Sequence, residues 1–176
     1  MIFIVNGAPG SGKTTFEQMV QEQMGESFCT IFSSIDFVKS LAKKCGWDGT
    51  KTPRNRKFLS DLKDLLTEWD DIPFKKIKRK IDEIKAEYSY YDIPPTSYCI
   101  FVDVREPTEI QKCCEQLGAK SLLIRSASRT ETTISNHADQ NVEEYNYDII
   151  IENQGTLEDL HQISTTFIQE EIKKKP

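Results

Sequence analysis

The sequence lacks the features of a membrane protein and of a disulfide-stabilised one. Its apolar runs are short, and none approaches the ~20 apolar residues that a membrane-spanning helix needs. There is no Cys-x-x-Cys pair, and no histidine stands close enough to the cysteines to complete a zinc site. The 5 cysteines are odd in number, and several lie in apolar runs, where cysteine acts as a small hydrophobic residue. We therefore expect reduced thiols, a cytoplasmic location and no membrane partner.

An excess of positive charge is also missing. Lysine and arginine total 23 against 28 aspartates and glutamates, and the net charge is -5. We therefore expect no nucleic-acid partner, although a local basic cluster for a small anion is compatible with this charge. The apolar N-terminus is short and uncharged, which predicts no signal peptide. Neither repeats nor low-complexity tracts occur, and the length of 176 residues predicts a single domain over residues 1–176.

The most specific motif follows the apolar run at residues 2–5. The segment Gly7–Thr14 fits the pattern Gly-x-x-x-x-Gly-Lys-Ser/Thr of a phosphate-binding loop, and a helical pattern follows it at residues 15–24. Lys13 is predicted to reach the β- and γ-phosphates of ATP, and the Thr14 hydroxyl to bind Mg²⁺. The residues of this segment that are predicted to bind the nucleotide are Gly7, Ala8, Pro9, Gly10, Ser11, Gly12, Lys13, Thr14 and Thr15.

Five short apolar runs alternate with helical patterns, which predicts an α/β fold. The runs lie at residues 2–5, 29–32, 98–102, 121–124 and 147–151. Continuous apolar strands of this kind form a parallel sheet that is covered by helices on both faces, the three-layer fold of P-loop NTPases. In such sheets ligands bind beyond the carboxyl ends of the strands. Candidate site residues are therefore those that directly follow a strand.

Between the second and third strands the sequence predicts a helical insertion at about 35–92. Its first helix carries an apolar stripe and has Ser34 as a reasonable N-cap. Thr52 and Pro53 open a second helix, with apolar residues from Phe58 to Trp69 along one face. A third helix starts near Asp71 or Pro73. The polar, aperiodic stretch 126–146 is predicted to be a small lid.

Asp103 and Arg105 follow the third strand, where this fold binds its ligand. Asp103 is predicted to hold Mg²⁺ or its waters, and Arg105 to contact a phosphate. The alternative is structural: Asp103 caps a helix and Arg105 forms a surface ion pair.

Two further basic clusters are candidates for phosphate contact. Arg54, Arg56 and Lys57 occupy the first turn of a predicted helix, where positive charge opposes the helix dipole unless an anion lies there. Arg125 and Arg129 are four residues apart at the start of the lid and could stabilise charge on a transferring phosphate. Each cluster could instead be a solvated surface patch; in the first, Asp61 could offset the charge.

With these residues the chain resembles the nucleoside monophosphate kinase group of P-loop kinases. The segment Ser33-Ser34-Ile35-Asp36 with Lys39 is similar to the group's acceptor-binding segment, although that group has Arg where Lys39 stands. Asp103-Val104-Arg105 resembles the group's motif after the third strand, Arg125 with Arg129 its lid arginines, and Asn153–Glu158 its turn beside the adenine of ATP. The likeness extends over the whole chain and is greatest to phage-type deoxynucleoside monophosphate kinases and animal phosphomevalonate kinases.

The phosphate-loop motif, the basic cluster at Arg54, Arg56 and Lys57, and the resemblance together give expected roles for individual residues. Asn153 and Gly155 are expected beside the nucleotide. The residues expected to bind the acceptor are Ser34, Asp36, Lys39, Arg54, Arg56, Lys57 and Arg105. The residues expected to act in catalysis are Lys13, Arg105, Arg125 and Arg129.

We therefore predict a monomeric or homodimeric kinase that uses ATP and Mg²⁺. Its acceptor is expected to be a small phosphorylated molecule, foremost a (deoxy)nucleoside monophosphate, with phosphomevalonate as an alternative. A nucleotide-binding module that regulates a partner is a different hypothesis, against which the lack of an Asp-x-x-Gly switch element after the third strand argues. A kinase that acts on polynucleotide ends is disfavoured by the acidic net charge.

Overall fold

The computed structural model describes residues 1–126, Val142 and 145–173. The chain forms two compact units, which we describe separately: unit 1 comprises Met1–Ile31 and Tyr91–Pro176, and unit 2 comprises Phe32–Tyr90. Arg129 and nearly all of the predicted lid lie outside the described residues. The prediction of one domain with an insertion at about 35–92 stays a prediction.

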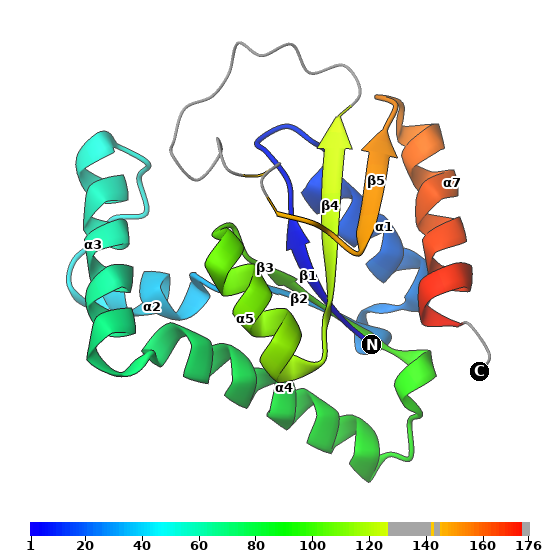
Figure 1. The fold of residues 1–176 in the computed structure, drawn as a ribbon, viewed down its shortest axis with the longest axis horizontal. Helices are drawn as coiled ribbons and strands as arrows, with labels where there is room; N and C mark the ends of the chain where they lie inside the picture. The colour runs from blue at the N-terminus through cyan, green and yellow to red at the C-terminus, as the bar shows by residue number, and fades with distance from the viewer. Residues whose placement is uncertain (127–141, 143–144, 174–176) are drawn as a thin grey trace. The chain divides into compact units, whose positions relative to one another are not determined.

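A five-stranded sheet forms the centre of unit 1, as predicted. Its strand order is β2-β3-β1-β4-β5, and β1 pairs in parallel with β3 and β4, as β4 does with β5. Figure 1 shows the carboxyl ends of β1, β4 and β5 at the same edge of the sheet. The strands are β1 (Ile2–Asn6), β2 (Cys29–Ser33), β3 (Cys99–Asp103), β4 (Lys120–Ser126) and β5 (Ile149–Asn153).

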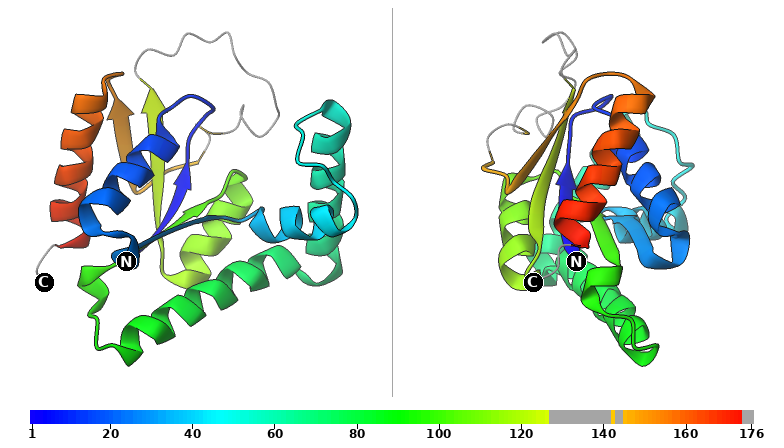
Figure 2. Two further views of the ribbon diagram at one scale, coloured as in Figure 1. Left: turned by 180° about the vertical axis from the view of Figure 1, so that it is seen from behind. Right: turned by 90° about the vertical axis from the view of Figure 1, so that its right-hand side faces the viewer.

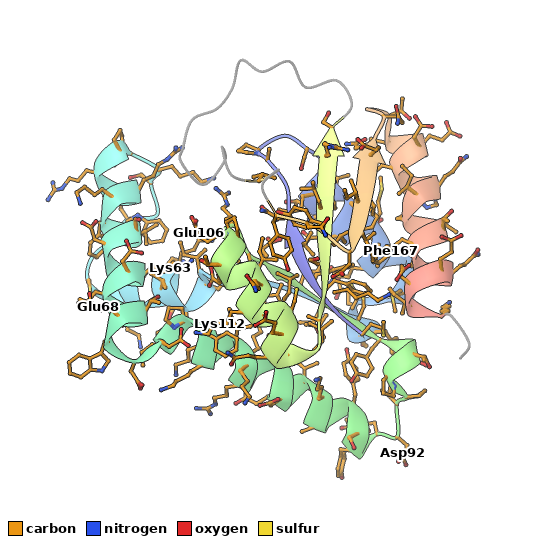
Figure 3. The ribbon with its side chains drawn as sticks, viewed as in Figure 1. Lys63, Glu68, Asp92, Glu106, Lys112 and Phe167 are labelled. Carbon is orange, nitrogen blue, oxygen red and sulfur yellow. The ribbon has the colours of Figure 1, made fainter. Side chains whose placement is uncertain are left out.

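Helices cover both faces of this sheet. Figure 2 shows α1 (Lys13–Met24) and α7 (Leu157–Phe167) on one face and α5 (Pro107–Leu117) on the other. Phe167, labelled in Figure 3, lies with its ring centroid 4.9 Å from that of Phe3 and 5.3 Å from that of Phe16. These rings belong to a buried cluster that joins the sheet to α1, α7 and the wide turn η5 (Ile168–Ile172). Short helical turns η1 (Glu26–Phe28) and η2 (Pro95–Ser97) precede β2 and β3.

The fifth strand begins two residues later than the sequence predicts. Tyr147 and Asp148 are not part of β5, and the Asp148 N–H donates to the Ser121 hydroxyl at 2.9 Å instead of to a backbone carbonyl of β4. The Asp148 carboxylate accepts hydrogen bonds from the Ser121 N–H and hydroxyl at 2.7 and 2.8 Å. Asn153, predicted to lie in the turn, is the last residue of β5.

Unit 2 consists of α2 (Asp36–Lys44), α3 (Pro53–Asp70) and α4 (Ile72–Tyr90). The predicted cap of α3 is confirmed, since Thr52 Oγ1 accepts the Asn55 N–H at 3.2 Å. The predicted cap of α2 is wrong: Ile35 occupies the N-cap position, and Ser34 is buried. No side-chain hydrogen bond caps α2.

The apolar stripe of α3 behaves differently from that of α4. Five residues of α4 are buried, Phe74 and Ile81 among them, whereas α3 has no buried residue. Leu65 and Trp69 are 61% and 81% exposed. Among the described helices, none combines the length and the apolar composition needed to span a membrane.

Candidate functional site

The loop between β1 and α1 has glycines in left-handed conformations and leads into a helix end without a side-chain cap. Gly10 and Gly12 have φ angles of 80° and 88°, left-handed values that favour glycine. Lys13 begins α1, and neither a capping side chain nor an acidic residue in the first turn neutralises that end of the helix. The positive end of the helix dipole is therefore available for phosphate, as the motif predicts.

Close packing fixes this loop against the ends of the neighbouring strands. A Cβ atom at Gly7 would lie 2.7 Å from a backbone oxygen of β4, and one at Gly12 would overlap the Asn153 amide. Asn153 Nδ2 donates to the Ser11 carbonyl at 2.9 Å, and its Oδ1 accepts the Gly155 N–H at 3.0 Å. Two residues predicted to bind nucleotide, Asn153 and Gly155, thus adjoin the loop.

Asn6, which is not among the predicted site residues, connects the loop to two other segments. Its Oδ1 accepts the Gly7 N–H at 2.8 Å. Its Nδ2 donates to the Arg105 carbonyl at 3.2 Å and to the Tyr147 hydroxyl at 2.8 Å. Tyr147 in turn donates to the Val142 carbonyl at 2.9 Å. A polar residue that ends an apolar strand directly before the loop was the available sequence signal.

Two of the predicted site residues lie together: Lys13 forms an ion pair with Asp103, the last residue of β3. A third charged residue, Glu17, joins them from the next turn of α1, with Oε2 3.9 Å from Lys13 Nζ. The Glu17 side chain is 1% exposed. Its signal in the sequence was an acidic residue between Phe16 and Val20, both of which are buried on α1.

Burial raises the pKa of Glu17 to about 8 from 4.5. The negative charge of Asp103 and a hydrogen bond to it act in the same direction, and Lys13 acts against them. Glu17 therefore carries its proton at neutral pH.

In the part of the chain that the structure describes, no group of three or more His, Cys, Asp or Glu residues is arranged to hold a metal ion.

This pKa predicts a pH-dependent stability. Below pH 4.5 both the folded and the unfolded chain hold the Glu17 proton, but between 4.5 and about 8 only the unfolded chain releases it. The free energy of unfolding therefore falls as pH rises through this window, by at most about 1.4 kcal/mol per pH unit, and levels off above it. Glu17→Gln removes the effect, so urea unfolding should give the variant a growing advantage from about pH 5 to 8.

Glu22→Gln is the matched control for this experiment, because Glu22 is an exposed residue of the same helix. It should follow the wild-type pH dependence. Parallel curves for wild type and Glu17→Gln would contradict a buried, protonated Glu17.

The predicted arginines have different surroundings. Arg125 of β4 pairs with Glu152, its register partner on β5, and its Nε donates to Oε1 at 3.0 Å. This hydrogen bond and the positive charge of Arg125 hold the pKa of Glu152 below its ordinary value. Arg105 lies two residues beyond β3, and Asn6 fixes its backbone. Arg129 is outside the described residues. The catalytic roles of Arg105, Arg125 and Arg129 stay predictions.

In unit 2, several predicted acceptor-binding cations already have acidic partners. Lys39 Nζ lies 3.6 Å from Asp36 Oδ1. Lys57 donates to both carboxylate oxygens of Asp61 at 2.8 and 2.7 Å, the charge offset that the alternative interpretation expects. Arg56 is exposed.

Arg54 lines a cavity of about 360 Å³ within unit 2. The rings of Trp47 and Phe58 line it too. The carboxylate of Asp48, another lining residue, accepts a hydrogen bond from the Asn55 amide at 2.9 Å. Hydrogen bonds from Thr50, and to a smaller extent the one from Asn55, lower the pKa of Asp48. The residues that line this cavity are Cys45, Gly46, Trp47, Asp48, Arg54, Asn55 and Phe58.

The fold and the loop after β1 together define a P-loop NTPase architecture. Neither a family model nor a curated protein matches the chain. Similar solved structures include a mutant of the APS kinase of Mycobacterium tuberculosis, with 12% identity and a TM-score of 0.44 over 96% of both chains. Dephospho-CoA kinase from Campylobacter jejuni shares 16% identity with a TM-score of 0.47 over 98% of both chains. TT1252 from Thermus thermophilus shares 16% with a TM-score of 0.44 over 97% of both chains. Such low similarity assigns no substrate.

Proposed function

We propose that this protein is a kinase that transfers the terminal phosphoryl group of ATP to a small phosphorylated acceptor, foremost a (deoxy)nucleoside monophosphate. The observation that carries the proposal is the open phosphate loop with Lys13 paired to Asp103. This arrangement supplies a cation, a carboxylate and an exposed helix N-terminus at the carboxyl edge of a parallel sheet.

The donor half of the site fits ATP and Mg²⁺ chemically. Thr14 and Asp103 offer oxygen atoms, the ligands that Mg²⁺ prefers, and would hold the ion or its waters. When bound, Mg²⁺ neutralises charge on the phosphates. The loop from Gly7 to Thr15 would bind the phosphates through its N–H groups, and Asn153 and Gly155 would lie beside the base.

Catalysis in this proposal consists of positioning and charge stabilisation. Lys13 would exchange its partner Asp103 for the phosphates of ATP. Arg105, Arg125 and Arg129 would stabilise charge that develops on the transferred group. The acceptor is already a phosphate, so the chain needs no general base.

Unit 2 would supply the acceptor half. The cavity beside Arg54 combines a guanidinium group, which can fork onto a phosphate, with the rings of Trp47 and Phe58, which can stack on a planar base. Ser34, Asp36, Lys39, Arg56 and Lys57 are the remaining acceptor-binding candidates, and the ion pairs Lys39–Asp36 and Lys57–Asp61 would open to release their cations.

An acceptor panel tests this function. ADP formation from ATP and Mg²⁺ is measured in a coupled assay with each nucleoside and deoxynucleoside monophosphate, with phosphomevalonate and without acceptor. We expect one acceptor to raise the rate of ADP release at least tenfold above the acceptor-free rate. Slow release that no acceptor stimulates would overturn the kinase proposal in favour of a regulatory nucleotide-binding module.

A further inference from the structure

The carboxyl group of Glu17 lies on the buried face of α1, which is unusual for an ionisable side chain. Its side chain is 1% exposed, and its neighbour Phe16 on α1 belongs to the buried cluster of unit 1. Burying an ionisable group costs free energy unless its partners compensate, and a leucine at this position would avoid that cost. Packing alone therefore does not account for a carboxyl group here.

The contacts of Glu17 are with the two charged groups of the candidate nucleotide site. Oε2 lies 3.9 Å from Lys13 Nζ, and Asp103, which itself pairs with Lys13, shares a hydrogen bond with the Glu17 carboxyl. The other oxygen, Oε1, is buried and meets no hydrogen-bond partner among the described residues. The side chain therefore contacts Lys13, one turn earlier on the same helix, and Asp103 at the end of β3.

We propose that Glu17 is a positioning residue of the nucleotide site, which holds Asp103 and Lys13 in the orientation that receives a nucleotide with Mg²⁺. This role rests on the proposed function, because it requires that the site bind ATP. Asp103 and Lys13 come from different elements, β3 and α1, and both side chains are partly exposed at 26% and 19%. Glu17 is buried and adjoins both, so in this role it restrains the ion pair that Lys13 and Asp103 form with each other.

A pair of substitutions separates positioning from packing. Glu17→Gln keeps the size of the side chain and its hydrogen-bonding ability, whereas Glu17→Leu keeps an approximate volume without them. Calorimetric titration with a non-hydrolysable ATP analogue, once with Mg²⁺ and once with EDTA, measures how much Mg²⁺ strengthens nucleotide binding. Glu22→Leu, an exposed change on the same helix, is the control.

We expect Glu17→Gln to bind within about threefold of wild type, and Glu17→Leu to lose at least about tenfold of the Mg²⁺-dependent gain in affinity, the usual loss when a group behind a metal ligand is removed. The thermal midpoint of each variant shows whether it is folded. If Glu17→Leu does not fold, Glu17→Met, which is unbranched and of similar length, replaces it.

The outcomes distinguish this role from the function on which it rests. A wild-type protein that binds no ATP analogue under either condition overturns the proposed function and this role with it. A wild-type protein that binds, while the leucine and glutamine variants retain the same Mg²⁺-dependent gain, overturns the role alone. Equal losses in both variants also overturn it, because hydrogen bonding would then not be what positions the site.

Discussion

Lys13→Met is expected to lower kcat/KM for ATP by about three orders of magnitude, the largest effect that we predict for a single side chain. Lys13 is the cation at the N-terminus of α1, and its only task in the proposed reaction is to stabilise charge on the phosphates. Removing one such preorganised charge or donor from a site typically costs about 10²–10³ in rate. The same substitution removes the cation that lies beside both Asp103 and Glu17. We expect this loss to weaken Mg²⁺-dependent nucleotide binding as a second, indirect effect.

The measurement is the coupled ADP assay with the best acceptor of the panel, together with analogue binding by calorimetry. Lys85→Met serves as the control, since Lys85 is an exposed lysine of α4, and it should behave as wild type. Lys13→Arg keeps the charge on a wider, planar head group and should recover only part of the rate. Turnover by Lys13→Met within threefold of wild type would contradict the assignment of the loop as the donor site.

The parts of the fold that the sequence predicts well are those whose signals are local. A glycine-rich pattern between an apolar run and a helix specifies the loop Gly7–Thr14, since backbone conformation and helix start depend on neighbouring residues. The start of α3 is equally local, because Thr52 caps the helix and Pro53 occupies its first position. Continuous apolar runs separated by helices also suffice to predict a covered parallel sheet.

Contacts between distant residues are what the sequence does not predict. The Asn6 amide bonds to Arg105 and Tyr147, which are 99 and 141 residues away. These bonds depend on β3 lying next to β1, and strand order does not follow from apolar runs. The start of β5 also depends on a distant residue, because the Asp148 N–H donates to the hydroxyl of Ser121, 27 residues earlier in the chain.

Apolar periodicity, by contrast, predicts the existence of a helix better than its burial. The stripe from Phe58 to Trp69 has the spacing of a packed face, and α3 forms, yet none of its side chains is buried and Leu65 and Trp69 are exposed. Burial depends on what the rest of the fold provides as a partner, which lies outside the local pattern. Glu17 shows the converse, since an ionisable residue occupies a buried position, next to Lys13 and Asp103, that the local pattern does not predict.

The second large effect is expected from Gly12→Ala, for two independent physical reasons. Gly12 has a φ of 88°, and an L-residue with a Cβ atom pays about 1–2 kcal/mol for a left-handed conformation. In addition, the new Cβ would overlap the Asn153 amide, which donates a hydrogen bond to the Ser11 carbonyl. The amide must therefore move, and this hydrogen bond is disturbed. Together we expect a loss of about 3 kcal/mol in the free energy of unfolding, or roughly 6–12 °C in Tm for a protein of this size, and a marked loss of nucleotide affinity.

Gly10→Ala provides the matched comparison, because it isolates the backbone term. Gly10 has a similar φ of 80°, but a Cβ atom there would meet nothing within 4 Å. It should cost only the conformational part, about 1–2 kcal/mol. Combining Gly12→Ala with Asn153→Ala tests the steric part: removing the amide relieves the overlap, so the double variant should be more stable than the sum of the two single losses predicts. Strict additivity, or equal losses at Gly10 and Gly12, would contradict a steric overlap with Asn153. The end of β5 would then not be what excludes a side chain at position 12 of the phosphate loop.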